Sequence, residues 1–180
     1  MKRPMVAVIG SGDTRPGDRS YTSAEEIGRS LVDNGFRVLT GGLRGIMEAA
    51  SKGAHLSEGY IDGSVIGILP GQDPALANEY VDIAIPTGLG IARNTIITNA
   101  DAIIAVGGGS GTLSEMAFAW QKGKLIIALD VPGWSGELGG RKLDERNRHP
   151  NVPDDRVYMA GSAREAVGIL LDKLPLYTSF

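Results

Sequence analysis

The chain has 180 residues, 42% of them hydrophobic, which is enough for one continuous core, so we expect residues 1–180 to form a single domain. Its formal net charge is -3, with 18 basic and 21 acidic residues, which argues against a surface that collects nucleic acid. It has no cysteine and 2 histidines, which argues against disulfides, thiolate chemistry and zinc sites, and we expect no metal and no resident cofactor.

The chain begins with Met1–Pro4 and passes directly into a short apolar run of strand length. A secretory signal would show a longer apolar region at this point. No apolar stretch approaches the roughly 20 residues that a membrane-spanning helix needs. We therefore expect a cytoplasmic protein with no membrane partner.

Seven short runs rich in β-branched residues recur between helical stretches. They are Met5–Ile9, Phe36–Thr40, Ser64–Leu69, Tyr80–Ile85, Ala102–Val106, Lys124–Leu129 and Arg156–Met159. Alternating strands and helices indicate a parallel sheet, and nearly continuous apolar runs are typical of strands covered on both faces. The predicted fold class is α/β, a Rossmann-like doubly wound and mostly parallel sheet of about seven strands with helices on both faces.

Helices are predicted from apolar periodicity and from two Ser-x-x-Glu capping patterns, which start at Ser23 and Ser162. The expected helices cover about Ser23–Asp33, Gly45–His55, Gly90–Ala100, Gly111–Gln121 and Ser162–Leu174. The stretch Val131–Asp155 is rich in Gly, Pro and charge and lacks helical or strand periodicity. It is predicted to be a surface loop or lid.

Glycine is unusually frequent, at 26 of 180 residues against an average usage of about 7%. Three clusters, Gly10–Gly12, Gly41–Gly45 and Gly107–Thr112, each follow a predicted strand. Any one cluster is explained by a tight turn. Together they would lie at the carboxyl edge of the sheet, where free N–H groups at helix starts attract anions. The expected phosphate- or nucleotide-binding residues are Gly10, Gly12, Gly41, Gly42, Gly108, Gly109, Gly111 and Thr112, and Asp13 is a further candidate contact.

Two common nucleotide motifs do not fit these turns. Arg15 stands where a dinucleotide fingerprint needs Gly or Ala, and no lysine separates Gly111 from Thr112 as a P-loop requires. The turn can still surround one phosphate with backbone amides and the Thr112 hydroxyl. The expected partner is therefore a nucleotide or another phosphorylated small molecule.

Glu115 lies three residues after Thr112, so on a helix both side chains project near the same face. A carboxylate beside a ribose can stabilise an oxocarbenium-like transition state during glycosidic cleavage. It can equally serve to complement the positive start of the helix. The sequence leaves both interpretations open.

Residues 107–115 read GGGSGTLSE, which resembles the PGGxGTxxE motif of the LOG (Lonely Guy) family, also called lysine decarboxylase-like proteins. Gly107 replaces the family's proline. Gly41–Gly45 is similar to the family's second glycine turn, and Arg93 stands where the family has its catalytic arginine, although Asn94 follows it in place of the family's lysine. The resemblance covers most of the chain and implies a metal-independent phosphoribohydrolase. Such an enzyme cuts a nucleoside 5′-monophosphate into free base and ribose 5-phosphate, here with Arg93 and Glu115 as catalytic residues.

The motif together with Ala117–Trp120 looks closer to a neighbouring branch, the molybdenum cofactor carrier-like and DprA-related nucleotide-binding proteins. A non-enzymatic carrier of a phosphorylated cofactor, such as molybdenum cofactor, is therefore the alternative, and whether the chain is an enzyme stays open. Single-stranded DNA binding ranks third, because the charge is acidic and aromatic residues make up only 6%.

The same resemblance implies a homo-oligomer, either a dimer or a tetramer. The helices expected at Gly90–Ala100 and Gly111–Gln121 are the candidates for pairing. Trp120, a large aromatic among alanines, is expected at this interface rather than at the ligand.

Overall fold

The computed structural model describes residues 3–178 and shows seven parallel strands in the order β4-β3-β2-β1-β5-β6-β7. The strands are β1 Met5–Gly10, β2 Arg37–Thr40, β3 Val65–Leu69, β4 Ile83–Pro86, β5 Ala102–Val106, β6 Leu125–Leu129 and β7 Val157–Ala160. The strand order reverses between β1 and β5, which is the position where doubly wound folds bind ligands. The predicted fold class is confirmed.

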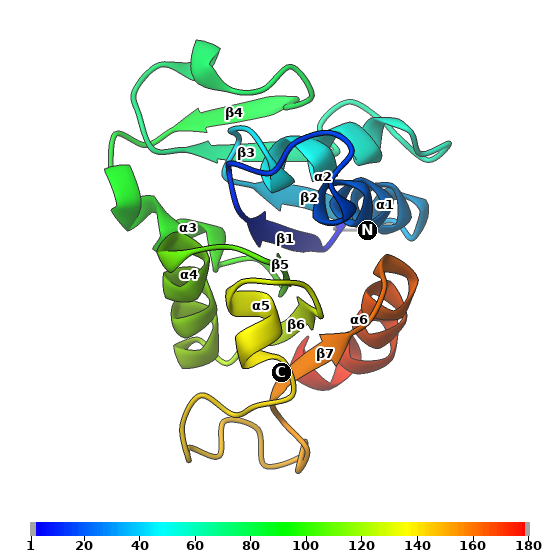
Figure 1. The fold of residues 1–180 in the computed structure, drawn as a ribbon, viewed down its shortest axis with the longest axis vertical. Coiled ribbons are helices and arrows are strands. Elements are labelled where there is room, and N and C mark those ends of the chain that lie inside the picture. Colours follow the sequence, from blue (N-terminus) through cyan, green and yellow to red (C-terminus); the bar gives the residue numbers. More distant parts are fainter. Residues whose placement is uncertain (1–2, 179–180) are drawn as a thin grey trace.

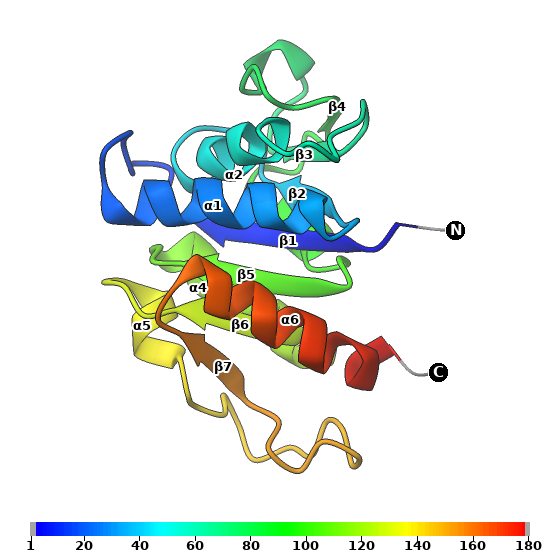
Figure 2. The ribbon, with the colours of Figure 1, turned by 90° about the vertical axis from the view of Figure 1, so that its right-hand side faces the viewer.

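Helices cover both faces of the sheet. They are α1 Arg19–Asp33, α2 Ile46–His55, α3 Asn94–Ile97, α4 Ser110–Gln121, α5 Trp134–Leu138 and α6 Ala163–Thr178, with 3-10 turns at Pro74–Leu76 and Gly90–Arg93. Figure 1 shows α1, α2 and α6 on one side of the sheet and α3 and α4 on the other. In Figure 2 the first group faces the viewer, and both chain ends lie at the same side of the molecule.

Residues of β1 alternate between two buried clusters, one on each face of the sheet. Val6 and Val8 pack in the cluster that includes α1, α2 and α6, whereas Ala7 and Ile9 pack in the cluster that includes α3 and α4. Because both faces are buried, the strand has no polar alternation. This explains the continuous apolar runs in the sequence.

The first helix begins before the predicted Ser23. Asp18 is its N-cap residue; its carboxylate accepts the Arg15 N–H at 2.8 Å, and its carbonyl accepts the Thr22 N–H at 3.1 Å. The second capping pattern is confirmed, since Ser162 Oγ accepts the Glu165 N–H at 3.2 Å. A capping pattern therefore marked the start of α6 and misplaced that of α1.

The helix predicted over Gly90–Ala100 is instead a 3-10 turn followed by the single-turn helix α3. Its four residues after Asn94 are β-branched, which lowers helix propensity. Lys122 donates hydrogen bonds to the Thr95 carbonyl, the Thr98 hydroxyl and the Asn99 side chain, and so satisfies acceptors where the helix ends.

The stretch Val131–Asp155, predicted to be a surface loop or lid, is a loop only in part. It contains α5, and two residues after this helix pair with the edge of β7, since the Gly140 N–H donates to the Val157 carbonyl at 2.8 Å and the Val157 N–H to the Arg141 carbonyl at 2.9 Å. Figure 2 shows the rest of the segment running below β7.

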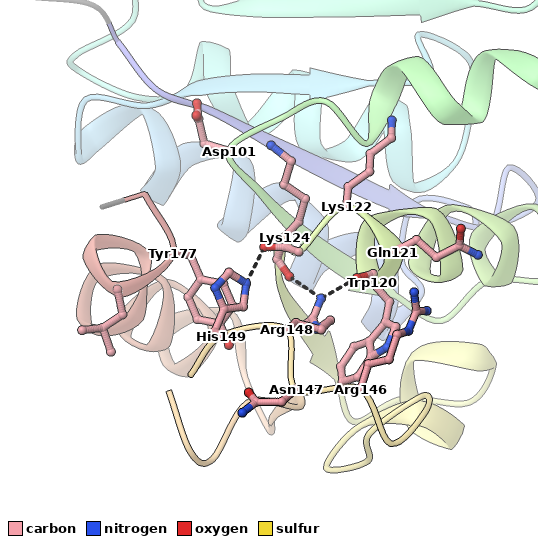
Figure 3. Close-up of a pocket in the computed structure, with 12 residues that line it drawn as sticks. Asp101, Trp120, Gln121, Lys122, Lys124, Arg146, Asn147, Arg148, His149 and Tyr177 are labelled. Atoms are coloured by element: carbon pink, nitrogen blue, oxygen red, sulfur yellow. Dashed lines mark hydrogen bonds between the residues drawn. The ribbon is translucent and has the colours of Figure 1, made fainter. Parts of the chain in front are cut away.

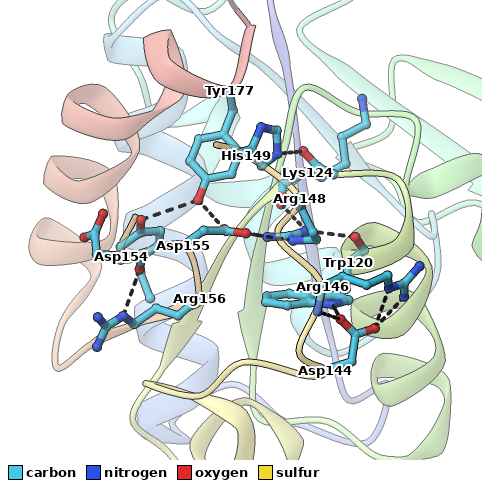
Figure 4. A network of polar contacts seen from close by, with 12 residues as sticks. Trp120, Lys124, Asp144, Arg146, Arg148, His149, Asp154, Asp155, Arg156 and Tyr177 are labelled. Carbon is cyan, nitrogen blue, oxygen red and sulfur yellow. Dashed lines mark hydrogen bonds and ion pairs between the residues drawn. The ribbon is translucent and has the colours of Figure 1, made fainter. Parts of the chain in front are cut away.

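Arg148 anchors this segment to the domain (Figure 4). Its guanidinium pairs with Asp155 at 2.6 Å, donates to the Trp120 and Lys124 carbonyls at 2.9 and 3.3 Å, and lies 3.6 Å from the centre of the Trp120 ring. Trp120 in turn donates to Asp144 at 3.0 Å. Trp120 is only 2% exposed within one chain, so its predicted place at a subunit interface is wrong.

Among residues 3–178, no helix is both long and apolar enough to cross a membrane.

Candidate functional site

The glycine turns that follow β1, β2 and β5 meet at the carboxyl edge of the sheet around a cavity of about 280 Å³. The predicted residues that line it are Gly10, Gly12, Asp13, Gly41, Arg93, Gly109, Gly111, Thr112 and Glu115. The structure therefore brings together both proposed catalytic side chains and most of the proposed binding residues. These turns come from strands far apart in the sequence, and the strand order places them side by side.

Arg93 reaches the cavity from the 3-10 turn before α3 and is held in place by the end of β3. Its Nη1 donates to the Ile68 carbonyl at 2.9 Å. The guanidinium lies directly against Gly41, where an added Cβ would clash with both terminal nitrogens. Glycine at this position thus makes room for a positive charge in the cavity wall.

Glu115 projects from α4 into the same cavity and is only 7% exposed. Burial raises its pKa to about 7, although the positive charge of Arg93 acts in the opposite direction. Burial also lowers the pKa of Arg93, against the charge of Glu115. The two side chains form no ion pair within 4.0 Å, and the Glu115 carboxylate makes no hydrogen bond to another residue of the described chain. A partly protonated carboxyl is therefore available to a ligand at neutral pH.

The turn after β5 leaves open space for an anion. No other described atom lies within 4 Å of a Cβ added at Gly109, and at Gly111 the nearest is Asn94 Nδ2 at 4.0 Å. The N-cap of α4 is Gly109, which provides no side-chain cap for the N–H groups of the first turn. These groups and the positive end of the helix are suited to a phosphate.

Gly42 and Gly108 are not among the residues that line the cavity, and their binding role stays a prediction. Gly42 has φ +73° and lies so close to Leu69 that a Cβ would come within 2.7 Å of its Cδ2. Gly108 has φ +92°, and a Cβ there would clash with the side chain of Thr112. Both glycines shape the turns from behind the cavity.

Ser135 supports the glycine turn and was missed by sequence reasoning. Its hydroxyl accepts the Gly107 N–H at 2.7 Å and donates to the Leu129 carbonyl at 2.7 Å, while the Trp134 N–H donates to the Gly108 carbonyl at 3.0 Å. The start of α5 is therefore a fixed wall of the turn. No motif signalled it, because Ser135 lies within the segment predicted to be a loop.

Several further lining residues were not predicted from the sequence. Met47 of α2, Asn94 of α3 and Ser11 of the first turn all border the cavity. Asn94 donates to Ser114 Oγ at 2.9 Å, which ties α3 to α4 beside the site. Asn94 occupies the position of the lysine in the LOG motif and so replaces a charge with a structural bond.

Across residues 3–178, no group of three or more His, Asp or Glu side chains converges as a metal site would.

A second cavity, at the opposite edge of the sheet, is rich in basic residues (Figure 3). Most of its basic groups already have partners. Lys122 binds the end of α3, Arg148 pairs with Asp155, and His149 contacts the Gly123 carbonyl at 2.8 Å. Among its described lining residues none belongs to a glycine turn at the start of a helix.

The sequence and the fold of this chain match known proteins. A model of the SLOG cluster4 family matches residues 3–166. The chain belongs to this family. A protein of Archaeoglobus fulgidus is 42% identical over 133 residues, which cover 73% of this chain and 83% of that protein.

Solved structures similar to this SLOG chain include molybdenum cofactor proteins. The molybdenum cofactor binding protein of Rippkaea orientalis has a TM-score of 0.78 and 35% identity, with 96% of this chain and 98% of that one covered. The molybdenum cofactor carrier protein of Chlamydomonas reinhardtii has a TM-score of 0.75 and 28% identity, with 96% and 99% covered. The predicted relationship to the carrier-like branch is therefore confirmed.

The similarity between this SLOG chain and the DNA processing protein A of Helicobacter pylori is one of fold only. Its TM-score is 0.63 at 19% identity, with 94% of this chain and 81% of that one covered.

Proposed function

We propose that this SLOG protein binds a phosphorylated small molecule at the glycine turns and acts as a non-enzymatic carrier of a pterin cofactor of the molybdenum cofactor type. The observation that carries the proposal is the similarity, over nearly the whole length of both chains, to proteins that bind or carry molybdenum cofactor. The cofactor is here the cargo, and the open anion site fits its phosphate.

Each part of the cavity has a role in this proposal. The N–H groups at the start of α4 and the Thr112 hydroxyl bind the phosphate oxygens. Arg93, fixed by the Ile68 carbonyl, contributes positive charge. Glu115, with its pKa raised to about 7, lessens the repulsion that a fully ionised carboxylate would exert on the anion. The site then holds its ligand without any reacting water.

Hydrolysis of a nucleoside 5′-monophosphate is the second candidate, because Glu115 is buried, unpaired and close to an arginine. In this reaction Glu115 accepts a proton from a water whose oxygen bonds to C1′ of the ribose. The C1′–N bond breaks, its electrons leave with the base, and the base takes up a proton. The carrier ranks first, because Gly107 and Asn94 depart from the hydrolase motif.

The test compares the protein with Gly111→Val, and with Gly168→Val as a matched control. A Cβ at Gly168 on α6 meets no described atom within 4 Å, and one at Gly111 meets only Asn94 Nδ2, at 4.0 Å, but Gly168 does not line the cavity. Each protein is purified from cells supplied with molybdate, then assayed for molybdenum and, after oxidation, for fluorescent pterin. We expect both signals in the parent and control, and at least a tenfold loss in Gly111→Val.

Equal loading of Gly111→Val and the parent protein would contradict the carrier proposal. A second arm incubates the parent protein and Glu115→Gln with a panel of nucleoside 5′-monophosphates and follows free base by chromatography. Release of base by the parent alone would place the hydrolase first.

A further inference from the structure

The phosphate cavity continues into a larger one of about 640 Å³. The two cavities share Gly12, Asp13 and Met47 as lining residues, so they meet along the first glycine turn and the start of α2. The phosphate cavity, at about 280 Å³, lies at the lower end of the volumes that hold whole small-molecule ligands. The adjoining space is therefore suited to the organic part of the same molecule.

The walls of this larger cavity are mainly apolar and are set in place by hydrogen bonds. Leu43 and Met47 line one part of it, and Leu76 lines another. Asn78 joins the two parts, since its Nδ2 donates to the Leu43 carbonyl at 2.7 Å and its N–H donates to the Gly42 carbonyl at 2.9 Å. Leu76 is 63% exposed. A flat ring placed here would cover it.

The polar groups of the cavity are unequal in charge. Arg44 provides the one guanidinium among the residues that line the larger cavity. This guanidinium makes no hydrogen bond or ion pair to another residue of the described chain. Asp13, Glu48 and Glu79 contribute three carboxylates. Glu48 lies in the first turn of α2, whose positive end favours an ionised carboxylate. Its Oε1 accepts a hydrogen bond from the Tyr21 hydroxyl, with 3.3 Å between the two oxygens. This set disfavours a second anion and favours a neutral ring that carries N–H donors.

We infer that this cavity binds a ring with a 2-amino-4-oxopyrimidine edge, as found in guanine and in pterins. The inference rests on the proposed phosphate site. The ring packs against Leu43, Met47 and Leu76. Glu48 accepts two parallel N–H bonds from the ring N–H and the amino group, and Arg44 donates to the ring carbonyl. Adenine presents a nitrogen lone pair where the carboxylate needs a donor, so it binds more weakly.

The test measures binding of GMP, AMP and ribose 5-phosphate by calorimetry. The parent protein is compared with Glu48→Gln and Arg44→Met. Glu58→Gln, an exposed acidic position outside the cavity, is the matched control. Tyr21→Phe removes the hydroxyl bonded to Glu48 and reports whether that bond alone changes the preference.

We expect the parent and Glu58→Gln to bind GMP at least tenfold more tightly than AMP. Glu48→Gln should lower this ratio at least fivefold, and Arg44→Met should weaken GMP more than AMP, while ribose 5-phosphate affinity stays the same in all proteins. Equal affinity for GMP and AMP, with ribose 5-phosphate still bound, would overturn this inference and leave the proposed function intact. Absence of binding by all three ligands would overturn both.

Discussion

At the scale of single residues, Glu115 and Arg93 are two opposite charges that line one cavity without forming an ion pair. Desolvation dominates both, since the pKa of Glu115 is raised and that of Arg93 is lowered despite their mutual attraction. Unpaired buried charges destabilise a fold unless a ligand or another group compensates for them. The desolvated pair therefore destabilises the unliganded protein, and an anionic, hydrogen-bonding ligand can reduce this destabilisation.

The raised pKa of Glu115 predicts a dependence of stability on pH. The pKa is about 7 in the folded protein and 4.5 as a free group. A raised pKa adds stability that is fully present below the unfolded value and is lost as pH rises through the folded value. Between pH 4.5 and 8 the parent protein should lose up to about 3 kcal/mol relative to Glu115→Gln. Urea unfolding at several pH values measures this, and parallel curves for the two proteins would refute it.

Gly107 explains at the same scale why the LOG motif is altered here. Its φ is +61°, whereas proline is fixed near -65°. Its N–H also donates to Ser135, and proline has no N–H to give. The replacement is visible in the sequence, but its partner is not, because Ser135 comes 28 residues later in a segment without a recognisable pattern.

At the scale of elements, the start of α5 holds the phosphate turn through Ser135. Ser135→Ala removes both hydrogen bonds of a fully buried hydroxyl. The Gly107 N–H then loses its Ser135 acceptor, whereas the Leu129 carbonyl keeps the Val131 N–H at 2.9 Å. We expect a loss of about 1–3 kcal/mol of stability and weaker binding of ribose 5-phosphate. Ser23→Ala is the control, because Ser23 lies inside α1 and caps nothing. Denaturant unfolding and calorimetry test this, and equal behaviour of the two variants would show that α5 does not support the turn.

Elements with strong periodicity could be predicted, and elements set by distant contacts could not. The strands were located within a few residues because both faces of the central strands are buried, so their apolar runs are continuous. The start of α1 was missed because the helix begins at Arg19, after Asp18, whose carboxylate accepts the Arg15 N–H of the preceding turn, and Ser23 lies inside the helix. The anchored path of Val131–Asp155 depends on Arg148 meeting Trp120, a contact that no local pattern encodes.

At the scale of the whole molecule, the strand order turns three separate sequence motifs into one site. Because β1 lies between β2 and β5, the turns after these strands become neighbours. Glycine clusters after strands were therefore enough to predict where the cavity lies. They did not reveal its larger neighbour, whose walls include the 3-10 turn at Pro74–Leu76, outside any motif.

The whole molecule also presents an apolar edge, which predicts self-association. Ile83 and Ile85 of the edge strand β4 are exposed, as is Leu89, and Ile91 is 88% exposed. An edge strand with exposed aliphatic side chains is a ready surface for pairing with another chain. We expect a homo-oligomer in which a second copy covers this edge. It would use the start of the predicted pairing segment Gly90–Ala100, but not Trp120.

The double variant Ile85→Lys with Ile91→Glu should therefore lower the mass in solution to that of a monomer, measured by light scattering after size exclusion. Leu171→Glu on α6 is the control, since Leu171 is exposed at a distance from this edge and its change should leave the mass unaltered. The substitutions place charges where the apolar contact between two copies would exclude water. The free energy needed to desolvate these charges exceeds the free energy gained from the contact. An unchanged oligomer in the double variant would mean that the chains pair through another face. A monomeric parent protein would contradict the expected homo-oligomer.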